Sequence, residues 1–101
     1  MTLNESENLI ILWAHNKGIL PDGQPLAQLE KTEEEVAELR EAIETKNLAE
    51  VKDALGDIFV TLAIQANLWG LGMEECVEHA YNIIKKRTGK MVNGKFVKDS
   101  C

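Results

Sequence analysis

The segment from Leu48 to Trp69 most limits the folds that are open to this chain. Its apolar side chains recur at helical spacing, and its second half is apolar nearly all round, which is typical of a helix packed among other helices. The longest uncharged stretch, from Ile58 to Leu71, contains the polar residues Thr61 and Gln65 and is shorter than the roughly 20 residues of a membrane span. We therefore expect a soluble protein with a central helix here and no membrane partner.

A short, buried helix is expected at the N-terminus. Asn4 or Ser6 can cap its start, and Gly18 can end it after a last turn between Trp13 and Lys17, because glycine commonly follows the last helical residue. Its apolar face is expected to consist of Leu9, Ile10, Leu12 and Trp13. A loop with the turn sequence Pro-Asp-Gly follows, over residues 18–25.

A second helix is expected from about Leu26 to Lys46, where apolar residues at helical spacing alternate with acids. Val36 and Leu39 are expected to face the core, and Asn47 breaks the helix before the central one begins.

A fourth helix is expected from Met73 to about Thr88, with Gly89 as its stop. The residues expected to face inward are Val77, Ala80, Tyr81 and Ile84. Beyond this helix, Asn93-Gly94 stands between alternating apolar residues, a pattern that favours a β-hairpin; an extended tail is the alternative.

Four helices joined by short loops predict an all-α four-helix bundle, and 101 residues are enough for a single domain spanning 1–101. The chain has only five aromatic residues (two Trp, one Tyr, two Phe), and much of the second helix is acidic, so one copy has a thin core. We therefore expect a homodimer or homotetramer to complete the bundle.

Charge is distributed unevenly along the chain. Residues 30–57 hold ten acids and four bases, whereas residues 85–99 hold five lysines and one arginine against Asp99 alone. The acidic middle argues against a nucleic-acid partner, which needs basic side chains spread over a face. The N-terminus carries acids where a secretory signal needs bases. With only Cys76 and Cys101 as thiols, this indicates a cytoplasmic protein with reduced cysteines.

Two pairs of carboxylates carry the candidate chemistry. Glu35 and Glu38 are three residues apart on the second helix, and Asp53 and Asp57 are four apart on the third, so each pair shares a helix face. If the helices pack antiparallel, four carboxylates converge, which is the all-oxygen ligand set that Mg²⁺ or Mn²⁺ prefers. The spacing alone leaves open that these acids are ordinary solvated surface.

The motifs QLEKTEEEVAEL (residues 28–39), KDALGD (52–57) and ECVEHAYNIIKKRTGKMVNGKFV (75–97) resemble, in order and spacing, the MazG-like branch of the all-α nucleoside triphosphate pyrophosphohydrolases, in particular its small phage and bacterial members. The usual family pattern on the third helix is Glu-x-x-Asp, but the residue three before Asp57 is Ala54. We expect Asp53 to take the place of that glutamate.

The resemblance implies hydrolysis of a nucleoside triphosphate (NTP) or deoxynucleoside triphosphate (dNTP) to the monophosphate and pyrophosphate, with Mg²⁺ between the carboxylates and the phosphates and water attacking the α-phosphorus. The expected metal ligands are Glu35, Glu38 and Asp57, with Asp53 as a fourth ligand or an orienting group. Glu34 is a minor candidate for positioning the water. Lys31, Asn82 and Lys85 are the candidates for contacts to phosphate or sugar. The rival hypothesis is a non-catalytic helical module whose acidic face binds a basic partner.

Overall fold

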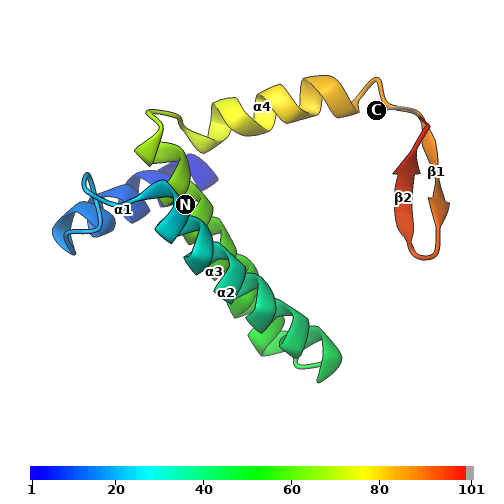
Figure 1. The fold of residues 1–101 in the computed structure, drawn as a ribbon, viewed down its shortest axis with the longest axis horizontal. Coiled ribbons are helices and arrows are strands. Elements are labelled where there is room, and N and C mark those ends of the chain that lie inside the picture. Colours follow the sequence, from blue (N-terminus) through cyan, green and yellow to red (C-terminus); the bar gives the residue numbers. More distant parts are fainter. Residues whose placement is uncertain (100–101) are drawn as a thin grey trace.

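The computed structural model describes residues 1–99, which form four helices followed by a two-stranded hairpin (Figure 1). The helices are α1 (Leu3–Asn16), α2 (Pro25–Glu44), α3 (Leu48–Leu68) and α4 (Met73–Ile84), and the strands are β1 (Gly89–Val92) and β2 (Lys95–Lys98). The all-α fold with a C-terminal hairpin is therefore confirmed. Cys76 is a half-buried free thiol, and Cys101 lies outside the described residues.

Helices α2 and α3 form an antiparallel pair, which is the most extensive packing between elements of the chain (Figure 1). Their interface contains small and polar side chains: Ala42 and Ala54 are buried, and the hydroxyl of Thr32 donates to the hydroxyl of Thr61 at 3.0 Å. The side-chain amide of Gln28 donates to the carbonyl of Thr61 at 3.1 Å. Small side chains let the helix axes approach closely, and these hydrogen bonds fix the register between the two helices.

The large apolar side chains of this helix pair lie mainly on exposed surfaces. Leu29, Val36 and Ile43 repeat every seven residues along α2 and are 46–58% exposed. On α3 the same spacing relates the exposed residues Leu48, Leu55, Leu62 and Trp69. The expectation that Val36 faces the core is therefore wrong for a single copy, because Thr32 and Ala42 occupy the buried side of α2; Leu39 is half-buried.

Helix α1 begins earlier than either expected cap, Asn4 or Ser6, allows. Thr2, not Asn4 or Ser6, is the N-cap: its hydroxyl accepts from the backbone N–H of Glu5 at 3.1 Å, and the Glu5 carboxylate accepts from the N–H of Thr2 at 3.0 Å. This reciprocal pair satisfies two backbone donors at the helix start. Gly18, with a φ of 78°, follows the last turn as expected.

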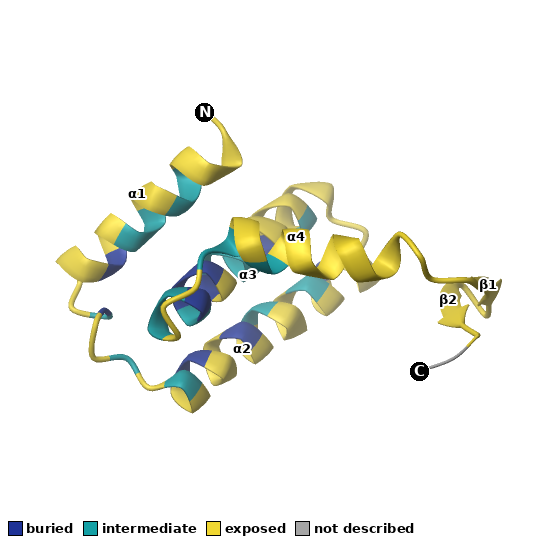
Figure 2. Ribbon diagram, turned by 90° about the horizontal axis from the view of Figure 1, so that it is seen from above, coloured by how far each residue is buried: buried dark blue, intermediate teal, exposed yellow. Residues whose placement is uncertain are grey.

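The small hydrophobic core lies between α1 and α3. Ala14, Leu20 and Ile64 are buried there, with Ile10 and Ile11 packed against them. Leu9, Leu12 and Trp13 are exposed, so the expectation that the apolar face of this helix is buried is wrong for these three side chains. One copy covers only the side of α1 that faces α3 (Figure 2).

Helix α4 leaves the end of α3 at an angle of 99° and projects away from the α2–α3 pair (Figures 1 and 2). It ends at Ile84, four residues before the expected end at Thr88, and Gly89 belongs to β1. Val77, Tyr81 and Ile84 are at least half exposed, and Ala80 is also exposed. The expectation that these side chains face inward is wrong within one copy, because no second element of the described chain lies over most of this helix.

The C-terminal segment is a hairpin rather than an extended tail. Asn93 and Gly94 have φ values of 51° and 82°, as a type I′ turn requires, and the strands pair Met91 with Phe96. Gly89 leaves room for the Phe96 ring, which occupies the space that a Cβ atom would take. All eight strand residues are exposed.

Among residues 1–99, none of the helices is by itself long and apolar enough to cross a bilayer; α3 and α4 meet that test only when taken together as a bent pair.

Candidate metal centre

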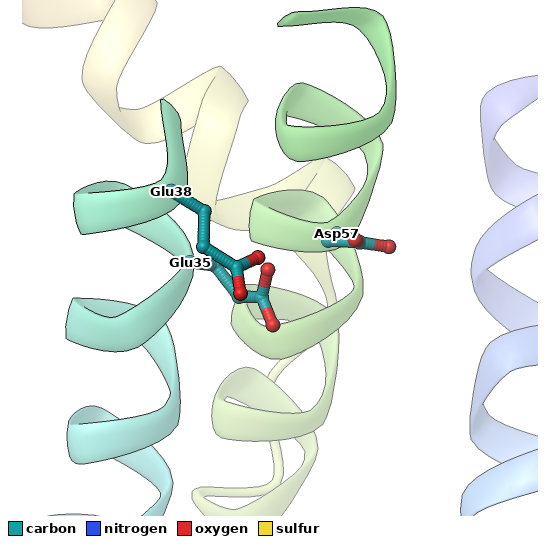
Figure 3. A group of neighbouring side chains, drawn as sticks. All are labelled: Glu35, Glu38 and Asp57. Atoms are coloured by element: carbon teal, nitrogen blue, oxygen red, sulfur yellow. The ribbon is translucent and has the colours of Figure 1, made fainter. Parts of the chain in front are cut away.

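Two glutamates on α2 form one half of the site. Glu35 and Glu38 lie one turn apart and project from α2 towards α3 (Figure 3). Thr32, one turn before Glu35, makes the hydroxyl contact to Thr61 of α3. Because this hydrogen bond fixes the helix register one turn away, the two glutamates are held opposite the middle of α3.

Asp57 on α3 completes the cluster. It lies one turn before Thr61, on the part of α3 that Glu35 and Glu38 approach (Figure 3). One carboxylate oxygen from each of Glu35, Glu38 and Asp57 lies within 4.8 Å of the other two. The expectation that acids from the second and third helices converge therefore agrees with the geometry for these three residues.

The cluster is electrostatically strained without a cation. Burial raises the pKa of Glu35, and the neighbouring carboxylates of Glu38 and Asp57 raise it further, while Lys31 opposes them. Burial also raises the pKa of Asp57, with further contributions from Asp53 and Glu38. The main cause of both shifts is burial, and repulsion from neighbouring carboxylates adds to it.

The donor set fits a hard divalent cation. The Oε2 atom of Glu35 is buried and has no hydrogen-bond partner among the described residues, an arrangement that is costly unless the oxygen binds something. Three carboxylates without nitrogen or sulfur ligands suit Mg²⁺ or Mn²⁺, which take oxygen ligands and retain bound water. Glu35, Glu38 and Asp57 can therefore hold such an ion.

Asp53 and Glu34 lie beside this cluster but outside it. Asp53 is exposed one turn before Asp57 and raises the pKa of Asp57 by its charge, yet it does not belong to the group within 4.8 Å. Glu34 points to solvent and pairs with Lys31 at 3.0 Å. Neither side chain is brought to the point where the three oxygens meet.

The three expected phosphate or sugar contacts differ in position. Lys31 lies at the edge of the site, where it lowers the pKa of Glu35. Asn82 is on α4, and Lys85 is the first residue after this helix. The ammonium group of Lys85 lies 6.0 Å from the centre of the Tyr81 ring. Because α4 projects away from α2 and α3 (Figure 1), Asn82 and Lys85 are not brought to the carboxylates of their own chain.

A hollow of about 450 Å³ opens beside the carboxylates, a size within the range of small-molecule sites. Its walls come from α1, the following loop, α2 and α3, and they consist of Trp13, Ile19, Gln28, Lys31, Glu35, Asp57, Val60, Thr61 and Ile64. Sequence reasoning missed Trp13, which it interpreted as a core residue. The signal for it is weak in the sequence, since only the packing of α1 on α3 places this half-exposed ring next to the acids.

Gly56 leaves the surface of α3 open next to Asp57. A Cβ atom at Gly56 would meet no other heavy atom within 4 Å, so neighbouring side chains do not require the glycine. Glycine inside a helix costs about 1 kcal/mol relative to alanine. At this position, the glycine leaves open space through which another molecule can approach Asp57.

Comparison with known protein families matches residues 24–92 to the MazG nucleotide pyrophosphohydrolase domain. Searches of curated proteins and of solved structures gave no match. The matched segment includes α2, α3 and α4 and all three carboxylates of the cluster. It covers about two thirds of the chain, and it indicates a hydrolase that acts on nucleotides. The chain belongs to the MazG nucleotide pyrophosphohydrolase family.

Proposed function

We propose that this protein is a Mg²⁺-dependent pyrophosphohydrolase that converts an NTP or dNTP to the monophosphate and pyrophosphate. The observation that carries the proposal is the Glu35–Glu38–Asp57 cluster with its unpartnered buried oxygen, in a chain of a nucleotide pyrophosphohydrolase family. Mn²⁺ is the alternative ion, since it accepts the same oxygen ligands.

In the proposed reaction, water forms a bond to the α-phosphorus and the bond from that phosphorus to the bridging oxygen breaks, so pyrophosphate leaves with the bridging oxygen. A bound Mg²⁺ would neutralise phosphate charge and stabilise the charge of the transition state. Glu35, Glu38 and Asp57 would hold the ion. Asp53, one turn from Asp57, would be a fourth ligand or an orienting group. Glu34 would act on the water only after its ion pair with Lys31 breaks.

The hollow beside the cluster is the proposed nucleoside site. Trp13 offers an aromatic surface on which a base can stack, and Val60 and Ile64 provide apolar walls. Lys31 lies on the same hollow and can reach an anionic group close to Glu35. The nucleoside would therefore lie between α1 and α3, with its phosphates towards the carboxylates.

Asn82 and Lys85 would contact the phosphates of a nucleotide that is bound to another copy of the chain. They are remote from the carboxylates of their own chain because of the direction of α4 (Figure 1). The exposed apolar repeats on α2 and α3 provide a surface by which copies can associate. A homodimer or homotetramer is therefore part of the proposal.

The test is a product assay on a panel of canonical and modified NTPs and dNTPs with Mg²⁺, with Mn²⁺ and with chelator. We expect pyrophosphate as the product and activity only with a divalent ion. Orthophosphate as the only product, or equal activity in chelator, would contradict the proposal.

A matched pair of variants separates catalysis from simple binding through an acidic face. Glu35→Gln and Glu41→Gln each remove one negative charge from α2, but Glu41 is exposed outside the cluster. We expect turnover to fall at least 100-fold only in Glu35→Gln. An acidic interaction module without a metal site would respond similarly to both changes.

A further inference from the structure

An apolar groove with acidic edges lies at the elbow between α1, α3 and α4. Its volume is about 430 Å³, and its apolar walls include Leu3, Phe59, Val77 and Tyr81. It is separate from the hollow beside the carboxylates, since the two share no lining residue. Leu3, Val77 and Tyr81 are each more than half exposed, so this surface is uncovered in one copy.

The charges at this groove are negative. Glu7, Glu74 and Glu78 line it, and no basic side chain of the described residues does. Glu7 accepts from the backbone N–H of Met73 at 2.8 Å, and Glu74 accepts from the side-chain amide of Asn4 at 2.9 Å. These two bonds hold acids at the rim without neutralising them, so the groove suits an apolar segment that is flanked by cations.

The β1–β2 hairpin has the complementary composition. Met91 and Phe96 form a cross-strand pair and are 66% and 50% exposed. Lys98 lies on the same face of the hairpin as this apolar pair, Lys90 and Lys95 lie on the other face, and the strands contain no acid. An isolated two-stranded hairpin is at best marginally stable in water, and every residue of these strands is exposed. The hairpin therefore has the composition that suits the groove, and docking on such a surface would stabilise it.

The hairpin does not lie on the groove of its own chain. It lies beyond the far end of α4, whereas the groove includes the first half of that helix (Figure 1). Two copies related by a two-fold axis, with their α4 helices antiparallel, would each bring a hairpin to the first half of the other α4. Each copy would then give its hairpin to the other, and the two identical contacts would form a closed dimer.

We propose that the β1–β2 hairpin of one copy docks into the α1–α3–α4 groove of a second copy. The Met91–Phe96 pair enters between Val77 and Tyr81 of the second copy, and Lys98, on the same face of the hairpin, lies against its acidic rim. This contact is independent of the hydrolytic reaction, and its test does not use activity.

Photochemical cross-linking tests the contact directly. Phe96 is replaced by p-benzoylphenylalanine in an unlabelled chain, which is mixed and re-equilibrated with the uniformly ¹⁵N-labelled wild-type chain. We expect cross-links that join the hairpin of the unlabelled chain to groove residues of the labelled chain, on α1, on α4 or at Phe59 of α3. Adducts confined to single chains, adducts outside the groove, or no adducts would overturn the proposal.

Acceptor variants supply the controls. Tyr81→Asp in the labelled chain places a charge in the groove, whereas Leu26→Asp places one at another exposed apolar residue. We expect the mixed-isotope yield to fall at least tenfold with Tyr81→Asp and less than twofold with Leu26→Asp. Both residues are largely exposed, and unchanged circular dichroism spectra check that the variants fold. Equal yields with the two acceptors would refute docking in this groove.

A charge exchange gives a second readout. Glu78→Lys in the acceptor should lower the cross-linking yield severalfold, and Lys98→Glu in the donor should restore at least half of it. If Lys98→Glu lowers the yield further in this acceptor, charge complementarity does not direct the hairpin to the groove.

Discussion

Asp57→Asn is expected to make the metal-free protein more stable while nearly abolishing turnover. The substitution keeps the volume of the side chain and removes one of three negative charges whose oxygens lie within 4.8 Å of one another. Loss of activity with gain of stability is the opposite of what a substitution that damages the core produces.

The magnitude follows from Coulomb's law. Two unit charges about 4 Å apart in water interact by about 1 kcal/mol, and more where solvent is partly excluded. Asp57 is half-buried. Because solvent still screens its charge, we use the interaction energy in water rather than a larger value. Removing its repulsion with Glu38, the cluster member whose charge raises the pKa of Asp57, should stabilise the fold by about 1 kcal/mol, or about 4–8 °C in Tm for a domain of this size.

The assay is thermal unfolding in chelator and in millimolar Mg²⁺, together with pyrophosphate release. Wild-type protein should gain stability from Mg²⁺, because binding to the folded state alone stabilises it by mass action, and Asp57→Asn should lose most of that gain. Glu41→Gln is the matched control, since it removes one negative charge from an exposed residue outside the cluster. A lower Tm for Asp57→Asn in chelator, or an undiminished response to Mg²⁺, would refute this reasoning.

Four other outcomes are expected. The pKa values of Glu35 and Asp57 are raised above their ordinary values of 4.5 and 3.8, so the folded state keeps protons that the unfolded state has already lost. In chelator, Tm should therefore fall as the pH rises above these ordinary values. Mg²⁺ or Glu35→Gln should make Tm depend less on pH. Trp13→Ala should raise KM about tenfold, as loss of a stacked base of about 1–3 kcal/mol implies, and an unchanged KM would remove Trp13 from the proposed nucleoside site. Gly56→Ala should stabilise the protein by about 0.5–1 kcal/mol and lower kcat/KM; higher stability with full activity would mean that the open space at Gly56 has no role. Light scattering should give a mass at least twice 11.3 kDa, and a fully active monomer would contradict the assembly.

The convergence of the carboxylates of Glu35, Glu38 and Asp57 could be predicted from the sequence because it depends on local spacing. Glu35 and Glu38 share a helix face by their separation, and the short turn between α2 and α3 brings Asp57 opposite them. Asp53 was harder to place, since a separation of four residues sets a common face but not the reach of a short side chain. Trp13 was missed because its neighbours come from α3, and such tertiary contacts leave no periodic signal in the chain.

The faces of the helices were predicted less well than the helices themselves. Hydrophobic periodicity identifies which residues avoid water, but not whether the same chain or another copy covers them. Val36 and Tyr81 satisfy the helical pattern and are still exposed, whereas Thr32 and Thr61 are buried because they hydrogen-bond to each other across the α2–α3 interface. The cap of α1 was misplaced because Thr2, Asn4 and Ser6 are all suitable residue types. Thr2 and Asn4 both have a glutamate three residues later, but Glu5 accepts from the N–H of Thr2, whereas Glu7 accepts from the N–H of Met73.

The most direct measurement of the central claim is hydrolysis of an NTP or dNTP in H₂¹⁸O with Mg²⁺, followed by mass spectrometry of both products. Attack of water on the α-phosphorus predicts one ¹⁸O atom in the nucleoside monophosphate and none in pyrophosphate, with both products absent from Glu35→Gln. Label in pyrophosphate instead, or release of labelled orthophosphate, would contradict the account.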